Sequence, residues 1–195
     1  MGLSIHYSGS FKQGESLSAM IEEVRDVAEV YNWKYTIFEE NFREKAFGKE
    51  AYSEEVFGIC FTPSDCETVS LTFLSNGKMF GVFNIAALSD PTLDNDFLHM
   101  VFVKTQYAGI EIHKLLIHLF KHISKKYFTN FELIDEGQYW ETGNEKLLEE
   151  MFQRYTDMIE SFSSALDSFP RLDGESFEDY FGRLGNKVWN RKRSG

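Results

Sequence analysis

Two short polar segments hold the residues whose types and spacing best suit chemistry. KTQYAGIEIH runs from Lys104 to His113, and DEGQYWE runs from Asp135 to Glu141. Together they supply an imidazole, several carboxylates and a glycine placed just before a helical pattern. The candidate ligand-binding residues in them are Lys104, Thr105, Gln106, Gly109, His113, Asp135, Glu136, Tyr139 and Glu141.

Three kinds of chemistry fit these residue types. The amides at the helix start, with Gly109 allowing close approach, could hold an anion. His113 and one acid could act as a general base and the group that orients it. The acids with His113 could also hold a divalent metal ion.

A structural explanation competes with each of these chemistries and is favoured. One glycine is not a phosphate loop, and acids beside it would repel an anion. Thr105 could simply cap the helix, and His113 lies beside Phe120 at the edge of an apolar helix stripe. Acids and glycines also gather at strand ends for structural reasons alone.

His118 and His122 form a second, weaker candidate, for a metal. Their i, i+4 spacing places both imidazoles on one face of a helix, but HLFKH lacks the glutamate of HExxH. A partly exposed helix flank explains the pair better. No GxGxxG, GxxxxGK[ST] or GxSxG pattern occurs, so no cofactor is predicted and an enzymatic activity is left open.

The elements around the two segments predict where they meet. HMVFV is a strand, a helix follows to about Tyr127, and NFELIDEG is the next strand. A helix of that length can return the chain to the start of the first strand, so the second strand would run parallel to it. Both segments would then lie at the carboxyl ends of strands, the edge where open α/β sheets bind ligands.

The remaining patterns predict an α+β fold. Alternating runs before and after Asn76-Gly77 predict a β-hairpin, and Thr142 with Glu145 predicts a capping box at the start of a long helix. We expect a mixed, largely antiparallel sheet of six to seven strands with helices packed on one face. Residues 1–170 form a single domain in this interpretation, and residues 171–195 form a C-terminal helical extension with a basic tail. The 19 phenylalanines predict a thick aromatic core.

Charge is distributed unevenly along the chain. The net charge is −11, residues 130–180 carry 14 acids against three bases, and the last thirteen residues carry five bases and no acid. An acidic protein repels a phosphate backbone, which disfavours nucleic-acid binding. A basic protein partner, or docking of the tail on the acidic helix, fits better, although a solvated surface that keeps the protein soluble explains the charge without any partner and is favoured.

The cellular compartment is predicted from patterns that the sequence does not contain. Cys60 and Cys66 match no common zinc or thioredoxin-type spacing. The N-terminal segment MGLSIHYSG lacks the succession of a signal peptide, and no run approaches the ~18 apolar residues of a membrane span. These features predict a cytoplasmic protein with reduced thiols and no membrane contact.

Several segments resemble a group of bacterial proteins that has no assigned activity. The segments KTQYAGIEIH, FELIDEGQYWETG, GLSIHYSG and CETVSLTF carry the resemblance, which covers most of the first 150 residues. It implies a bacterial, cytoplasmic setting and no particular chemistry.

The leading functional hypothesis is a soluble, non-catalytic binding or interaction module, such as an immunity-like protein or an adaptor, with an acidic partner surface. The alternative is a small enzyme or ligand-binding protein with its site between Lys104–His113 and Asp135–Glu141. A third possibility is self-association through the helix at residues 144–168.

Overall fold

The computed structural model describes residues 2–42, 47, 55–87 and 99–191. The chain divides into two compact units, residues 2–152 and residues 153–195. The division falls within helix α5 (Glu145–Ser168), whereas the sequence places the boundary at residue 170. The fold class is α+β, as predicted, with six strands in two three-stranded antiparallel sheets.

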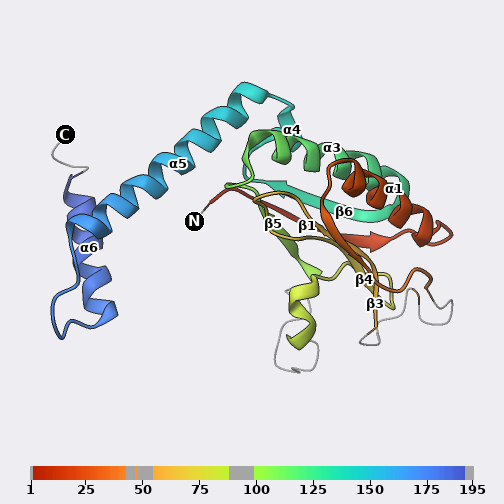
Figure 1. The fold of residues 1–195 in the computed structure, drawn as a ribbon, viewed down its shortest axis with the longest axis horizontal. Coiled ribbons are helices and arrows are strands. Elements are labelled where there is room, and N and C mark those ends of the chain that lie inside the picture. The colour runs from red at the N-terminus through yellow and green to blue at the C-terminus, as the bar shows by residue number, and fades with distance from the viewer. Residues whose placement is uncertain (1, 43–46, 48–54, 88–98, 192–195) are drawn as a thin grey trace. The chain divides into compact units, whose positions relative to one another are not determined.

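The first sheet has the order β5-β1-β6 (Figure 1). Strand β1 (Ser4–Phe11) runs antiparallel both to β5 (Val101–Lys104) and to β6 (Phe128–Asp135). Strands β5 and β6 are therefore parallel to each other, with β1 between them and helix α3 (Gly109–Tyr127) connecting them. The predicted parallel relation of these two strands is confirmed.

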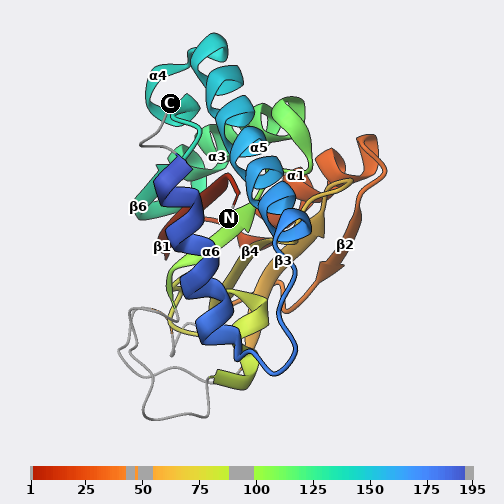
Figure 2. The same cartoon turned by 90° about the vertical axis from the view of Figure 1, so that its left-hand side faces the viewer.

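The second sheet has the order β2-β3-β4, built from β2 (Lys34–Ile37), β3 (Val56–Thr62) and β4 (Val69–Leu74). Figure 2 shows β2 at its outer edge, beside β3. The hairpin turn at Asn76-Gly77 forms as predicted, because Gly77 N donates to Leu74 O and Leu74 N donates to Lys78 O.

The strand expected after that turn is shorter than its sequence pattern predicts. Met79 pairs with Phe73 of β4, while Lys78 pairs with Ser10 of β1, so the segment is shared between the two sheets. It makes single bridges to each instead of a ladder to one. The chain then enters a 3-10 helix, η1 (Val82–Ala87).

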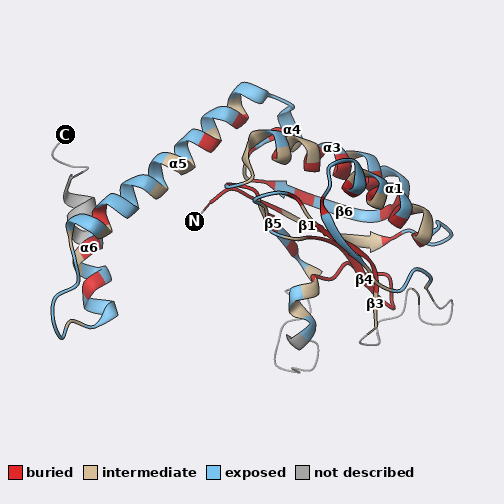
Figure 3. Ribbon diagram, viewed as in Figure 1, coloured by how far each residue is buried: buried red, intermediate tan, exposed pale blue. Residues whose placement is uncertain are grey.

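Helices α1 (Leu17–Val30) and α3 cover one face of the sheets, as predicted (Figure 1). Helix α1 begins at Ser16, whose side chain accepts from Ala19 N. The inward faces of both helices are buried (Figure 3). On α1 these residues are Leu17, Met20, Ile21, Val24 and Ala28, and on α3 they include Leu116, Leu119, Phe120 and Ile123.

Between helices and sheets lies a core rich in aromatic rings, which confirms the interpretation of the phenylalanine content. The buried rings belong to Tyr7, Phe11, Phe57, Phe61, Phe73, Phe80, Phe120 and Tyr127. Trp33 also serves as a packing anchor, with its ring stacked on Phe61 at 5.5 Å between centroids.

Tyr7 ties the two sheets together. Its hydroxyl donates to Ser70 O at 3.0 Å and accepts from Ser70 N at 3.1 Å, so β1 is joined to β4 through one fully enclosed side chain. Burial raises the pKa of this phenol above its usual range. The hydroxyl therefore stays protonated and can keep both roles.

We expect Tyr7→Phe to lower the free energy of unfolding by about 1–3 kcal/mol, because two buried backbone groups of Ser70 lose their partner. Urea denaturation of the purified chain measures this difference. Tyr35→Phe is the control, since its hydroxyl bonds Glu29 on the surface and its loss should cost less than about 0.5 kcal/mol. Equal effects of the two variants would contradict the proposed bridging role.

The start of α5 differs from the prediction. Asn144 provides the cap, with its Oδ1 accepting from Leu147 N at 3.2 Å. Thr142 instead ends the short helix α4 (Tyr139–Thr142), and its hydroxyl donates to Gln138 O. The capping box of Thr142 and Glu145 is therefore wrong, because α4 and the turn at Gly143 occupy the residues it would have used.

The second unit contains the rest of α5 and helix α6 (Phe177–Arg191). Helix α5 ends at Ser168, just before Pro170, as expected. Helix α6 begins after Ser176, whose hydroxyl accepts from Asp179 N, and it continues to Arg191 in the basic tail. Arg183 pairs with Glu175 and also donates to Pro170 O, and the Arg183 guanidinium lowers the pKa of Glu175 to about 2.

Among the described residues, no helix combines the length and the apolar character needed to cross a membrane.

Candidate functional site

The two polar segments lie at the same edge of the first sheet, as the sequence predicts. In the register of the strands, Ser4 is opposite Lys104 of β5, and Ile5 is opposite Asp135 of β6. The ends of β5 and β6 therefore flank the start of β1. The turns that follow these strands lie close enough for their side chains to interact.

Asp135 is the centre of this cluster and is almost fully buried. Its carboxylate accepts backbone N–H groups from Gly137 at 2.7 Å, Tyr139 at 2.8 Å and Trp140 at 2.9 Å. These bonds close the turn between β6 and α4 and satisfy amides at the start of α4. A side chain that accepts three backbone donors determines the shape of the turn around it.

His113 lies beside Asp135 and has no exposed surface. Its Nε2 is 3.0 Å from Asp135 Oδ1, in a bent geometry that falls short of a regular hydrogen bond. Its Nδ1 is 2.8 Å from Thr105 Oγ1. The sequence places His113 at the edge of the apolar stripe of α3, but the structure places it among the buried residues of that helix.

Thr105 completes a continuous network, which we call the Asp135–His113–Thr105 network. Its hydroxyl lies 3.4 Å from Leu3 O as well as 2.8 Å from His113 Nδ1. A hydroxyl has one proton, so it donates to the carbonyl or to the imidazole. In either arrangement the proton is used inside the protein.

The network resembles a carboxylate–imidazole–hydroxyl relay in its residue types, but it is closed to substrate. Thr105 and the side chains of His113 and Asp135 are 0% exposed. Phe152 packs edge-on against His113 with ring centroids 5.6 Å apart. A catalytic base must reach its substrate within hydrogen-bonding distance, so in this conformation the network acts as a structural clamp.

Other predicted site residues also make internal contacts. Gln106 Oε1 accepts from Leu3 N at 3.2 Å, and Glu136 Oε2 accepts from Ser4 N at 2.7 Å. Together with Thr105 they hold the start of β1 in place. These bonds fix the N-terminal strand between the two turns.

The side chains of the remaining predicted residues lie outside the clamp. Lys104 uses its backbone N–H to donate to Glu67 at 2.9 Å, and Glu141 is exposed. Tyr139 is buried and packs edge-on against His118, with Lys121 over its ring.

The helix start at Gly109 does not match the predicted cap. Helix α3 begins after Ala108 with no side-chain cap, so the interpretation of Thr105 as a capping residue is wrong. The reason is that the Thr105 side chain points to His113, while its backbone carbonyl accepts from Ala108 N and Gly109 N. Those two amides are engaged and cannot both serve an anion.

His118 and His122 are both exposed on α3. His122 Nε2 is 3.0 Å from Glu23 of α1, whose carboxylate also accepts from Lys126 and Tyr127. In the part of the chain that is described, no three His, Cys, Asp or Glu side chains are grouped as metal ligands. His118 and His122, the weak candidate for a metal site, therefore have no third ligand beside them among the described residues.

The clamp predicts how stability depends on pH. Burial by itself would raise the pKa of Asp135, but the contact with His113 and the N–H donors of Trp140 and Gly137 outweigh it, so the pKa lies below its usual value. The stabilisation is therefore present above the unfolded-state pKa of about 3.9 and is lost as pH falls through the lower folded-state pKa. We expect the free energy of unfolding to fall more steeply in wild type than in Asp135→Asn between about pH 5 and pH 2. Urea denaturation across that range measures it, and identical slopes would contradict it.

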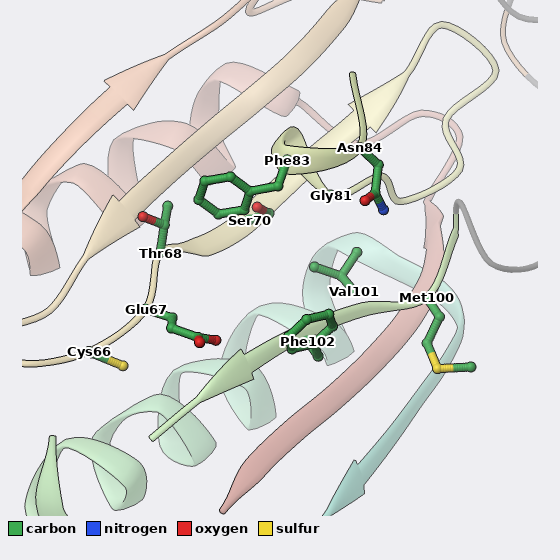
Figure 4. A pocket seen from close by; sticks show the side chains of 10 residues that line it. All are labelled: Cys66, Glu67, Thr68, Ser70, Gly81, Phe83, Asn84, Met100, Val101 and Phe102. Carbon is green, nitrogen blue, oxygen red and sulfur yellow. The ribbon is translucent and has the colours of Figure 1, made fainter. Parts of the chain in front are cut away.

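A cavity on the chain was not predicted from the sequence. It has a volume of about 420 Å³ and lies between the segment 66–70, helix η1 and strand β5 (Figure 4). Phe83 and Phe102 line it and are 77% and 54% exposed. Phe102 occupies the outward position between two buried valines in β5, but the run VFV is apolar throughout and does not indicate which of its residues faces outward.

Comparison with known proteins finds no matching family model, no matching curated protein and no matching solved structure. The resemblance to bacterial proteins therefore stays a prediction.

Proposed function

We propose that this chain is a non-catalytic interaction protein that binds a basic protein partner through the acidic surface of helix α5, as an immunity-like protein or an adaptor would. One observation carries the proposal. The acids of α5 are exposed, whereas the acids at the end of β6 are used inside the fold.

The exposed acids lie along the whole length of α5, which itself carries two bases, Lys146 and Arg154, and Lys114 of α3 pairs with Glu145 at 2.9 Å. These acids are Glu145, Glu149, Glu150, Asp157, Glu160 and Asp167. A surface of one sign steers an oppositely charged partner toward it and repels nucleic acid. This argues for a basic protein and against a nucleic-acid backbone as the partner.

The enzyme hypothesis is the weaker one because of the clamp. The residues with the best types for acid–base chemistry, His113 and Asp135, are enclosed. Asp135 accepts from three backbone N–H groups, and His113 lies 3.0 Å from Asp135 and 2.8 Å from Thr105 Oγ1. A reaction there would require the turns after β5 and β6 to open.

Both cysteines are free, which agrees with the proposed reducing, bacterial cytoplasmic setting.

Self-association through residues 144–168 is a second candidate. It is favoured by Met158 and Phe162 of α5, which are 40% and 38% exposed. Two acidic helices would repel each other, however, so a dimer through this surface should strengthen as salt rises. Sedimentation at low and high salt distinguishes it from binding to a basic partner, which should weaken.

The test begins with capture of a partner from bacterial extract and continues with that partner purified. We expect binding to the full chain to weaken at least about tenfold between 50 and 300 mM salt, as titration calorimetry would measure. The triple variant Glu149→Gln, Asp157→Asn, Glu160→Gln should weaken it similarly. The matched variant Glu22→Gln, Asp26→Asn, Glu29→Gln changes the net charge equally on α1 and should bind as wild type. Salt-independent binding, or equal loss in both variants, would overturn the proposal.

A further inference from the structure

The cavity beside β5 has features of a small-molecule site that are separate from the acidic surface of α5. Its volume of about 420 Å³ lies in the range of pockets that bind small ligands. It is lined by the turn before β4, by β4 itself, by η1 and by the outward side of β5 (Figure 4). Apolar groups make up most of its wall, with a few polar groups among them.

Two phenylalanine rings form the apolar part of the wall. Phe83 comes from η1 and Phe102 from β5, so the rings reach the cavity from separate elements (Figure 4). Both are more than half exposed, whereas most phenylalanines of the two sheets are buried. Exposed aromatic side chains that gather around a hollow indicate a binding surface.

Met100 adds to this surface and is 53% exposed. Its flexible thioether can adapt to the shape of a bound group. Phe102 also lies near His6 of β1, with ring centroids 5.9 Å apart. The apolar wall therefore combines two aromatic rings with a flexible neighbour, Met100.

Among the described residues that line the cavity, one side chain is charged, the carboxylate of Glu67. Its Oε2 accepts from Lys104 N at 2.9 Å, which orients the group. Within the described residues no donor meets Oε1, so that oxygen can accept from a ligand. The aliphatic part of the Lys104 side chain lies beside Gly2, since its Cδ would be 3.3 Å from a Cβ added to Gly2.

The other polar groups of the wall are neutral. Ser70 and Asn84 supply a hydroxyl and an amide, and burial raises the pKa of the Cys66 thiol to about 12, so the thiol carries no charge near neutral pH. The described wall of the cavity therefore combines aromatic rings with the negative charge of Glu67. A cation is attracted by the carboxylate and an anion is repelled, while the rings offer contact to an apolar group.

We propose that this cavity binds a small amine that carries an aromatic or similarly apolar group, with the apolar group against Phe83 and Phe102 and the ammonium on Glu67. Binding here is independent of the proposed protein partner, because none of the α5 acids lines this cavity. Either proposal can fail without the other.

Three probes of one shape and different charge test the inference on the wild-type chain. Phenethylamine, phenethyl alcohol and phenylacetate share the ring and differ in the polar end. Amide chemical shifts, followed by titration, should show the amine binding about tenfold more tightly than the alcohol, and the carboxylate more weakly still. The shifts should centre on residues 67–70 and 82–84. Absence of binding at millimolar amine, or equal affinity for the three probes, would overturn the inference.

Variants separate the charge from the aromatic wall. Glu67→Gln keeps an acceptor for Lys104 N, so we expect the chain to fold and the preference for amine over alcohol to disappear. Phe83→Ala removes an exposed ring and should weaken amine and alcohol equally, by about tenfold. Glu22→Gln on α1 is the control with the same charge change and should bind all probes as wild type. Retention of the amine preference in Glu67→Gln would assign the binding to another place.

Discussion

Replacing Asp135 by alanine is expected to lower the free energy of unfolding by about 3–5 kcal/mol, the largest effect of any substitution considered. The substitution leaves three backbone N–H groups, those of Gly137, Tyr139 and Trp140, without an acceptor in a buried turn. It also removes the carboxylate that lies 3.0 Å from the buried imidazole of His113. Urea denaturation followed by circular dichroism measures the loss.

A nearby acid provides the matched control. Glu141 lies six residues further along, is exposed, and should tolerate replacement by alanine within about 0.5 kcal/mol. A double-mutant cycle of Asp135→Ala with His113→Ala should show a coupling energy of about 1–3 kcal/mol, since the two side chains share one network. A loss below about 1 kcal/mol for Asp135→Ala, or additive effects in the cycle, would show that the cluster contributes little to the fold.

The arrangement of the strands around this cluster could be predicted because it follows from chain length and direction. A helix ending near Tyr127 is long enough to bring the chain back, so β6 had to run parallel to β5. The same argument placed Asp135 and Lys104 at one edge. The sequence did not show that β1 lies between the two parallel strands, since pairing between distant strands leaves no local signal.

Whether the candidate site is an open pocket or is buried could not be predicted in the same way. Residue types alone suggested a pocket around His113, and the structure fills that place with Phe152, Leu148 and the start of β1. Burial depends on what packs against a turn from elsewhere in the chain. Here the first turns of α5, which come later in the chain than the site residues, pack against the turn and bury the site.

Local signals also misled where two candidates for one role lay close together. Thr142 and Asn144 can both cap a helix, and the choice depended on the short helix α4, which uses the Thr142 hydroxyl. The exposure of Phe102 was missed for a different reason. In an apolar run such as VFV the alternation that separates inward from outward positions is invisible, so the exposed ring beside the cavity could not be recognised.

Gly137→Ala should be the second most damaging substitution, with a loss of about 2–3 kcal/mol. A Cβ at this position would lie 2.6 Å from Leu148 Cδ1, 2.9 Å from His113 Nε2 and 3.0 Å from Asp135 Oδ1. The added methyl group would therefore push into the network and into the first turns of α5 at once. The loss of stability comes from steric crowding and not from backbone strain, because the backbone of Gly137 does not adopt the left-handed conformation that favours glycine.

Gly81→Ala is the matched control for this prediction, since it lies in the same unit, also lacks a positive φ, and meets its nearest atom at 3.5 Å, an ordinary contact. We expect it to change stability by less than about 0.5 kcal/mol. Combining Gly137→Ala with Leu148→Ala removes the closest clash, so the double variant should be more stable than the sum of the single losses predicts. Strict additivity would mean that the methyl group is accommodated elsewhere, and that glycine at this position does not determine how closely α5 packs over the His113 imidazole.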